Sequence, residues 1–214
     1  LFTQRDTTVS LESQYSSLIF VDKSDFKPID GLTKDKLEES VFNQAINTKI
    51  KSGGIYGMYL TENQKMLDFK RLSALLKTEL TTKQLTAFSD PFLMGIYNNG
   101  VRSVNSEKGG DFFILLKTAT FTEIFPVMLA WENNMFKDLH GFFGIPLLPA
   151  TKYLLTTNFE DRIIGNKNAR ALLDKDGKIV LMYIYADDSS MLITNSEEVA
   201  EEVITRLASS KIKK

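Results

Sequence analysis

The sequence predicts an α+β fold in which a mainly antiparallel sheet packs against several helices. Three observations indicate this class: apolar runs that follow one another directly, helical stripes that are amphipathic, and turn residues at hairpin spacing near the C-terminus. The 214 residues suit one large domain or two small ones. We divide them into a loose lead-in at 1–17, an N-terminal α/β subdomain at 18–90 and a C-terminal ββαβββα subdomain at 91–214, with a single domain as the alternative.

The N-terminal third shows strands and capped helices in turn. Leu18–Val21 is short, apolar and β-branched, which predicts a strand, and a loop is expected from there to Gly31. Thr33 is the predicted cap of a first helix, and Asp68 is the predicted cap of a second. The other elements expected here are a strand at 55–60 and a short helix at 82–88.

The central part predicts two paired strands and the longest helix. Phe92–Tyr97 and Phe112–Lys117 are apolar runs joined by a polar loop with glycines, which favours an antiparallel pair. The helix that follows has Pro126 in its expected first turn, where a missing N–H is harmless, and His140-Gly141 at its expected end. Its apolar stripe consists of Ile124, Met128, Trp131, Met135 and Leu139.

The final third predicts a β-meander followed by a helix. Arg162–Leu173 and Lys178–Tyr185 flank Asp174–Gly177, a hairpin turn with glycine where a positive φ is needed. Met191–Thr194 is expected to form a third strand. Thr194–Glu197 offers a cap for the last helix, whose acidic start and lysine-rich end suit the helix dipole.

The composition excludes several classes of function. The chain has 26 lysines and arginines against 27 aspartates and glutamates, which argues against a nucleic-acid partner. It has no cysteine, so thiol catalysis, iron–sulfur clusters and zinc fingers are excluded. The single histidine leaves no histidine-rich metal site, and we expect no cofactor.

Few residues suggest chemistry. His140 is either a catalytic base or, as the following glycine favours, the polar end of a helix. Asp174 and Asp176 are spaced faintly like a calcium loop, but the hairpin interpretation fits their turn chemistry better. The acidic pairs Glu160-Asp161 and Asp187-Asp188 do not define a dyad, because neighbouring strand residues point to opposite faces. No catalytic, cofactor-binding or metal residue is therefore assigned.

The most unusual segment is the apolar connection Gly141–Ala150, because loops normally run over the surface. Exposed, it would form a patch suited to a protein partner or a membrane surface. The rarity of such patches favours the other interpretation, in which it folds over one end of the sheet as part of the core. The residues of this candidate interaction loop are Phe142, Phe143, Ile145, Leu147 and Leu148.

Several phrases occur in a characteristic order between Pro91 and Leu207: FLMGIY, DFFILLK, FPVMLAWENNMFKDL, NARALLDKDGKIVLMYIY and MLITNSEEV. In this order they resemble an uncharacterised family of membrane-anchored extracytoplasmic proteins from candidate-phyla bacteria. The resemblance implies a membrane-spanning segment before Leu1 and a domain on the extracytoplasmic face of the cell membrane. It carries no catalytic residues onto this chain.

We therefore expect a non-enzymatic, tethered domain that acts through protein–protein contacts in the cell envelope. The first alternative is a small-ligand-binding protein or a hydrolase with a site of scattered aspartate, glutamate, tyrosine and lysine side chains. The second is a membrane-surface module that uses 142–148.

Overall fold

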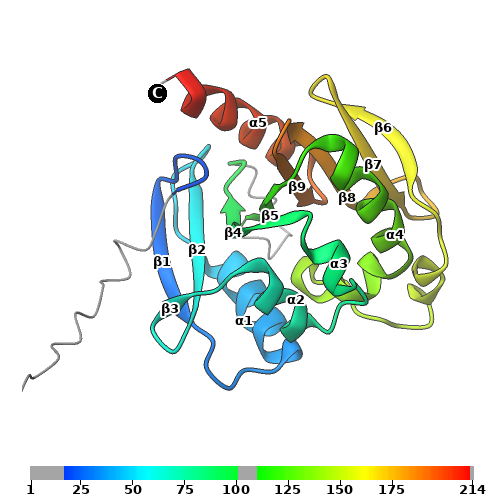
Figure 1. The fold of residues 1–214 in the computed structure, drawn as a ribbon, viewed down its shortest axis with the longest axis horizontal. Coiled ribbons are helices and arrows are strands. Elements are labelled where there is room, and N and C mark those ends of the chain that lie inside the picture. The colour runs from blue at the N-terminus through cyan, green and yellow to red at the C-terminus, as the bar shows by residue number, and fades with distance from the viewer. Residues whose placement is uncertain (1–16, 101–109, 213–214) are drawn as a thin grey trace, which may run out of the picture.

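The computed structural model describes residues 17–100 and 110–212, with the side chains of the last two left out. A single nine-stranded sheet runs through these residues in the order β1-β2-β4-β5-β9-β8-β7-β6, and β3 pairs with the side of β2 (Figure 1). The strands are β1 Lys23–Pro28, β2 Ile55–Glu62, β3 Lys65–Met66, β4 Phe88–Tyr97, β5 Asp111–Thr118, β6 Glu160–Ile164, β7 Lys167–Leu173, β8 Ile179–Asp187 and β9 Ser190–Thr194.

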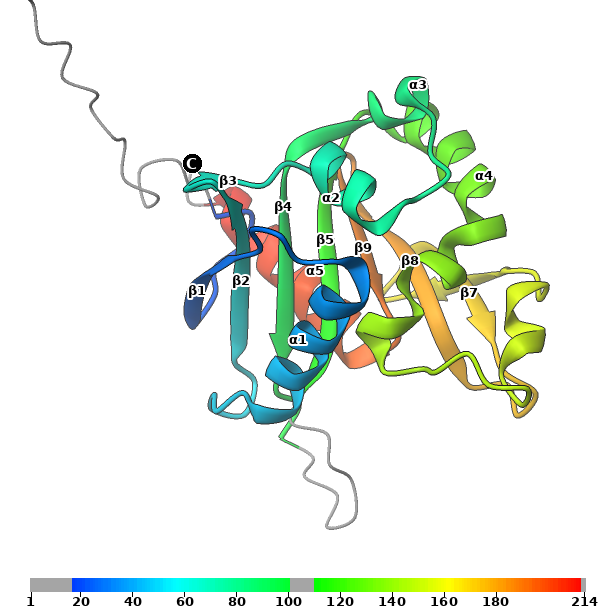
Figure 2. The same cartoon turned by 90° about the horizontal axis from the view of Figure 1, so that it is seen from below.

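Helices cover both faces of this sheet, so the molecule has three layers. The α-helices are α1 Lys34–Asn47, α2 Phe69–Leu76, α3 Thr82–Leu85, α4 Phe121–Leu139 and α5 Glu197–Ile212, with two 3₁₀ helices at η2 His140–Phe143 and η3 Lys152–Leu155. Figure 2 shows α1, α2 and α4 on one side of the sheet and α5 on the other. Each face has its own buried cluster, because successive side chains of every strand point to opposite faces.

The α+β class is confirmed, but the sheet is mixed rather than purely antiparallel. β1 runs parallel to β2, from Lys23 opposite Tyr56 to Pro28 opposite Thr61, whereas the other pairs are antiparallel. The sheet also continues across residue 90, because β4 pairs with both β2 and β5. The division into two subdomains therefore remains a prediction about folding units, within one continuous sheet.

The first strand lies later than the sequence predicts. Leu18–Val21 is not a strand, and β1 occupies the segment expected to be a loop. Ile19 is instead buried against the α5 side of the sheet. The polar residues of β1 gave no strand signal because an edge strand is held mainly by its backbone and buries little side-chain surface.

The predicted helix caps are largely confirmed. Thr33 Oγ1 accepts from the Lys36 amide at 3.4 Å, and Asp68 Oδ1 accepts from the Arg71 amide at 2.6 Å. At α5 the predicted pairing of Thr194 with Glu197 is wrong, because Thr194 ends β9 and the helix begins at Glu197. The capping side chain is Ser196, whose Oγ accepts from the Val199 amide at 3.4 Å.

α4 confirms its predicted stripe, whose five residues are all buried, but begins earlier than expected. Thr120 and Glu123 form a capping box, with Glu123 Oε2 accepting from the Thr120 hydroxyl at 2.8 Å. Pro126 therefore lies in the second turn, not the first. The carbonyl that loses its partner is that of Thr122, on an exposed part of the helix where water can bind it.

The end of α4 also differs from the prediction. The chain continues past His140 as η2, and Gly144 supplies the left-handed stop at a φ of 66°. Gly141 has another role, since a Cβ at this position would collide with the carboxylate of Glu38 on α1. Glycine here thus lets η2 approach α1 closely.

The segment predicted as one strand at Arg162–Leu173 is two strands. β6 and β7 form a hairpin around Gly165 and Asn166, which have φ values of 53° and 59°. Two positive values in a two-residue loop are typical of a type I′ turn, and a Gly-Asn dipeptide is one of its signals. The hairpin makes β6 the last strand of the sheet.

Candidate functional site

A groove of about 440 Å³ lies between the N-terminal half of α4 and the last strands of the sheet. One wall is Phe121 and Phe125 of α4, together with Tyr185 of β8. The ring centroids of Phe121 and Tyr185 are 4.6 Å apart, and those of Phe121 and Phe125 are 5.4 Å apart. The opposite wall and floor come from β6 and β7 and consist of Asp161, Arg162, Ile163, Asn168, Ala169 and Arg170.

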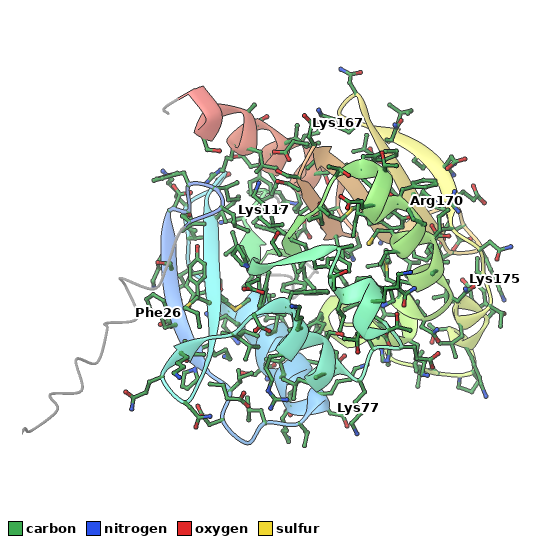
Figure 3. The ribbon with its side chains drawn as sticks, in the orientation of Figure 1. Phe26, Lys77, Lys117, Lys167, Arg170 and Lys175 are labelled. Atoms are coloured by element: carbon green, nitrogen blue, oxygen red, sulfur yellow. The ribbon has the colours of Figure 1, made fainter. Side chains whose placement is uncertain are left out.

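Strand pairing explains why these residues meet. Asp161 pairs with Arg170, and Ile163 pairs with Asn168, so the four side chains point to the same face of the β6–β7 hairpin. Arg170 also pairs with Tyr183 of β8, which extends this face toward α4. Figure 3 labels Arg170 beside α4 and β6, where the helix passes over the end of the sheet.

The polar part of the site is an ion-pair network centred on Arg170. Its guanidinium donates to both oxygens of Glu132 on α4, through Nε and, at 3.0 Å, through Nη2. Nη1 donates to Asp161 at 2.7 Å, and Tyr183 donates its hydroxyl proton to Glu132 at 2.6 Å. The network joins α4 to β6, β7 and β8 and holds the groove walls at a fixed separation.

The electrostatics of this network suit binding better than proton transfer. The Glu132 hydrogen bonds raise the pKa of Arg170, so the guanidinium stays charged. Burial and the Glu132 carboxylate raise the pKa of Tyr183 well above its usual range, and burial raises that of Tyr185 to about 12. Neither phenol supplies a base near neutral pH, and both oxygens of Glu132 are already engaged.

The groove also concentrates exposed apolar surface. Among the described residues, seven large apolar side chains are exposed, and three of them line this groove. Ile163 is 67% exposed although it lies within a strand. A concave site with aromatic walls and a few fixed polar groups is typical of binding sites.

The candidate interaction loop at 141–150 is divided by the structure. Phe142 is 1% exposed and stacks on Phe112 with ring centroids 5.6 Å apart, and Phe143 packs edge-on against the same ring. Ile145 is half-buried, whereas Leu147 and Leu148 are exposed. Phe142 is therefore too buried to contact a partner, and an interaction role remains a prediction for the half-buried Phe143 and Ile145 and for the exposed leucines.

The other candidates from the sequence have structural places. Burial lowers the pKa of His140, whose Nδ1 lies 2.7 Å from the Ile145 carbonyl oxygen and thus ties η2 to the loop. Asp174 Oδ1 accepts from the amides of Asp176 and Lys178, each at 2.9 Å, which confirms the hairpin turn. Asp187 is the last residue of β8 and pairs with Ser190, and Asp188 lies in the turn between β8 and β9.

One serine–lysine cluster lies outside the groove. Lys117 Nζ donates to Ser189 Oγ at 3.1 Å and to Ser190 Oγ at 2.9 Å. A lysine that donates to both hydroxyls acts as their hydrogen-bond donor, whereas activation of a serine requires a base that accepts its proton. The cluster therefore stabilises the β8–β9 turn.

Sequence reasoning missed the groove residues. The sequence shows Glu160-Asp161 only as an acidic pair. It does not indicate that Arg170 and Glu132 are in contact, because they lie 38 positions apart. The Gly165-Asn166 turn signal was present in the sequence. It would have revealed the hairpin, and with it the shared face of Asp161 and Arg170.

The described ranges contain neither a metal-ligand cluster nor a membrane-spanning helix. In 17–100 and 110–212, no three histidine, aspartate or glutamate side chains gather closely enough to hold a metal ion. Within those residues, no helix is both long and apolar enough to span a membrane. Comparisons of the chain with protein-family models, curated proteins and solved structures find no match.

Proposed function

We propose that this chain is a non-enzymatic binding domain that acts through protein–protein contacts, with the groove between α4 and the β6–β8 strands as its contact surface. The observation that carries the proposal is the gathering of Phe121, Phe125 and Ile163, all exposed, around one cavity beside a rigid ion-pair network. Exposed apolar surface of this kind is costly in water unless a partner covers it.

The wider setting is a proposal that rests on the family resemblance. The shared phrases over residues 91–207 support an extracytoplasmic domain tethered to the cell membrane, with its partner in the cell envelope. The groove-forming elements α4, β6, β7 and β8 all fall within that stretch.

A small-ligand receptor is the second candidate. A cavity of about 440 Å³ falls within the range of small-molecule sites. Its wide apolar rim, with Ile163 largely exposed, suits a protein surface better than an enclosed ligand.

Side-chain mimics can test the groove directly. We expect indole and p-cresol, titrated into ¹⁵N-labelled protein, to shift the amide signals of Ile163, Asn168 and Arg170, because a groove that receives partner side chains should accept their isolated rings. Phe125→Ser should weaken these shifts, and Leu148→Ser, an exposed apolar position elsewhere, should not. Shifts centred away from the groove, or equal in the two variants, would contradict the proposal.

A further inference from the structure

We propose that the partner of this groove is an extended peptide segment that adds to the free edge of β6 as a further strand. One apolar side chain of the peptide enters the groove, and a basic side chain lies opposite Asp161. This inference rests on the proposed function and names the ligand class of the same site. Addition of a strand to a sheet edge is a recurring mode of peptide recognition.

The register of the hairpin shows which backbone groups of β6 face outward. Ile164 and Lys167 flank the two-residue turn, and such flanking residues form a hydrogen-bonded pair. Pairs alternate along an antiparallel ladder, so Asp161 and Ile163 belong to non-hydrogen-bonded pairs. Their N–H and C=O groups therefore point away from β7, toward the side of β6 on which no other strand of the described residues pairs.

The same two residues place their side chains on the groove face. Residues paired across two strands point to one face, so the peptide residues opposite Asp161 and Ile163 also point toward α4. The peptide residue opposite Ile163 meets the 67% exposed Ile163 and, beyond it, the aromatic wall. Backbone pairing and side-chain insertion are thus possible at the same time.

The charges of the groove rim favour a basic residue at the second position. Glu132 neutralises Arg170, and Glu160 pairs with Arg162 at 3.0 Å. Asp161 is the remaining carboxylate, and its side chain is 91% exposed although it also contacts Arg170. An incoming lysine or arginine opposite Asp161 is therefore attracted, whereas an acidic residue is repelled.

In the free protein, Arg162 occupies one of the outward-facing backbone carbonyls of β6. Its Nη1 donates to the carbonyl of the preceding residue, Asp161, at 3.1 Å. The Arg162 side chain that makes this bond is exposed. An added strand has to displace this contact, which is a common way of limiting unspecific edge pairing.

A second copy of the chain fits the edge less well than a foreign peptide. Symmetric antiparallel pairing of two β6 strands centred on Arg162 would use the outward groups of both Asp161 and Ile163. It would also place two guanidiniums directly opposite each other, and like charges in that position are destabilising. A peptide with a basic and an apolar residue meets no such conflict.

Fluorescence anisotropy with synthetic peptides tests the inference. The probe is a fluorescein-labelled nine-residue peptide of threonines with a central phenylalanine–threonine–lysine, an order set for antiparallel pairing. We expect Phe125→Ser or Ile163→Thr to weaken its binding about tenfold, because each removes apolar contact in the groove. Leu148→Ser serves as the matched control and should leave binding unchanged.

Two further changes separate the parts of the interaction. Replacing the peptide lysine with glutamate should weaken binding about three- to fivefold, and Asp161→Lys should reverse this preference. Methylating the peptide amides that face β6 should weaken binding at least tenfold, since edge hydrogen bonds are lost.

Each failure has a distinct meaning. If the methylated peptide binds equally well, strand addition is overturned while the groove remains a binding site. If no peptide binds but indole and p-cresol still shift the groove amides, the peptide class is wrong and the proposed function stands. If sedimentation shows a dimer of the wild type that Ile163→Thr abolishes, the occupant is a second copy and the inference is overturned.

Discussion

The two ends of the sheet are built in opposite ways. At the β1 end, Arg206 of α5 holds the segments that lead into β1 and β2 by donating to Asp22 Oδ2 at 3.0 Å and to the carbonyls of Phe20 and Gly53 at 2.8 and 2.9 Å. β1 itself is charged, exposed and ends in Pro28, all features that protect a strand edge. At the β6 end, the last strand exposes Ile163 beside an open groove.

This difference indicates which end of the molecule is used for contacts. Both ends contain an arginine with several partners, but Arg206 joins the N-terminal segment to α5, whereas Arg170 holds open the space between α4 and β6–β8. The first arginine links α5 to the starts of β1 and β2, and the second supports a groove. Substitutions at the two ends should therefore have different consequences.

The largest effect on unfolding free energy is expected at the β1 end. Arg206→Ala leaves the partly buried carboxylate of Asp22 with fewer partners and removes donors from two backbone carbonyls. A hydrogen bond to a charged group contributes about 1.5–3 kcal/mol of unfolding free energy, and Arg206 makes several such bonds. Urea unfolding measures this loss.

The matched control is Arg71→Ala, because Arg71 pairs with Glu62 at 2.7 Å on an exposed surface. Exposed pairs contribute little to stability, because water and salt screen them. If the two substitutions cost the same, the account of Arg206 as the link between α5 and the starts of β1 and β2 is wrong.

A smaller effect should appear as a pH dependence of stability that comes from Asp22. Burial alone would raise the pKa of Asp22, but hydrogen bonds from Lys51, the Ile55 amide and Arg206 outweigh it and lower this pKa from 3.8 to about 2. The charged form is thus favoured in the folded state. Its stabilising contribution is present above pH 3.8 and is lost as the pH falls through about 2.

Asp22→Asn should therefore flatten the change of unfolding free energy between pH 4 and pH 2. Burial raises the pKa values of Glu38 and Asp138, so the folded state favours their protonated forms. These two acids therefore lower the unfolding free energy as the pH rises, whereas Asp22 lowers it as the pH falls. An unchanged slope in Asp22→Asn would show that another carboxylate controls this range.

The smallest effect comes from a matched pair of tyrosines at the groove. The Tyr183 hydroxyl donates to Glu132 at 2.6 Å, so Tyr183→Phe should cost about 1–3 kcal/mol of unfolding free energy. The Tyr185 hydroxyl is buried and makes no hydrogen bond of ordinary geometry, although the nearby Tyr183 hydroxyl partly offsets the effect of burial on its pKa. Tyr185→Phe should change stability by less than about 0.5 kcal/mol.

Thermal unfolding of both variants, compared at one pH, checks this pair. Equal losses would mean that the two hydroxyls share one hydrogen-bond network. The network would then extend to the aromatic wall of the groove, and the polar part of the site would be larger than the ion pairs around Arg170 indicate.

Local elements were predictable where a pattern repeats over several turns or a cap has a fixed spacing. The α4 stripe, the caps at Thr33 and Asp68 and the turn at Asp174–Gly177 were all predicted correctly. β1 has little apolar signal and is not predictable in this way. The β6–β7 hairpin is predictable from the turn signal of Gly165-Asn166, which the apolar pattern of 162–173 alone does not reveal.

The sequence by itself determined the α+β class, most of the helices and most of the apolar strands, because propensity, periodicity and capping act over a few neighbouring residues. Tertiary structure alone decided that β1 joins β2 in parallel and that β6 lies at an open edge. It also brought Glu132 and Arg170 together over 38 positions. These outcomes depend on which surfaces find partners when the layers pack, and such contacts between distant residues leave no local pattern.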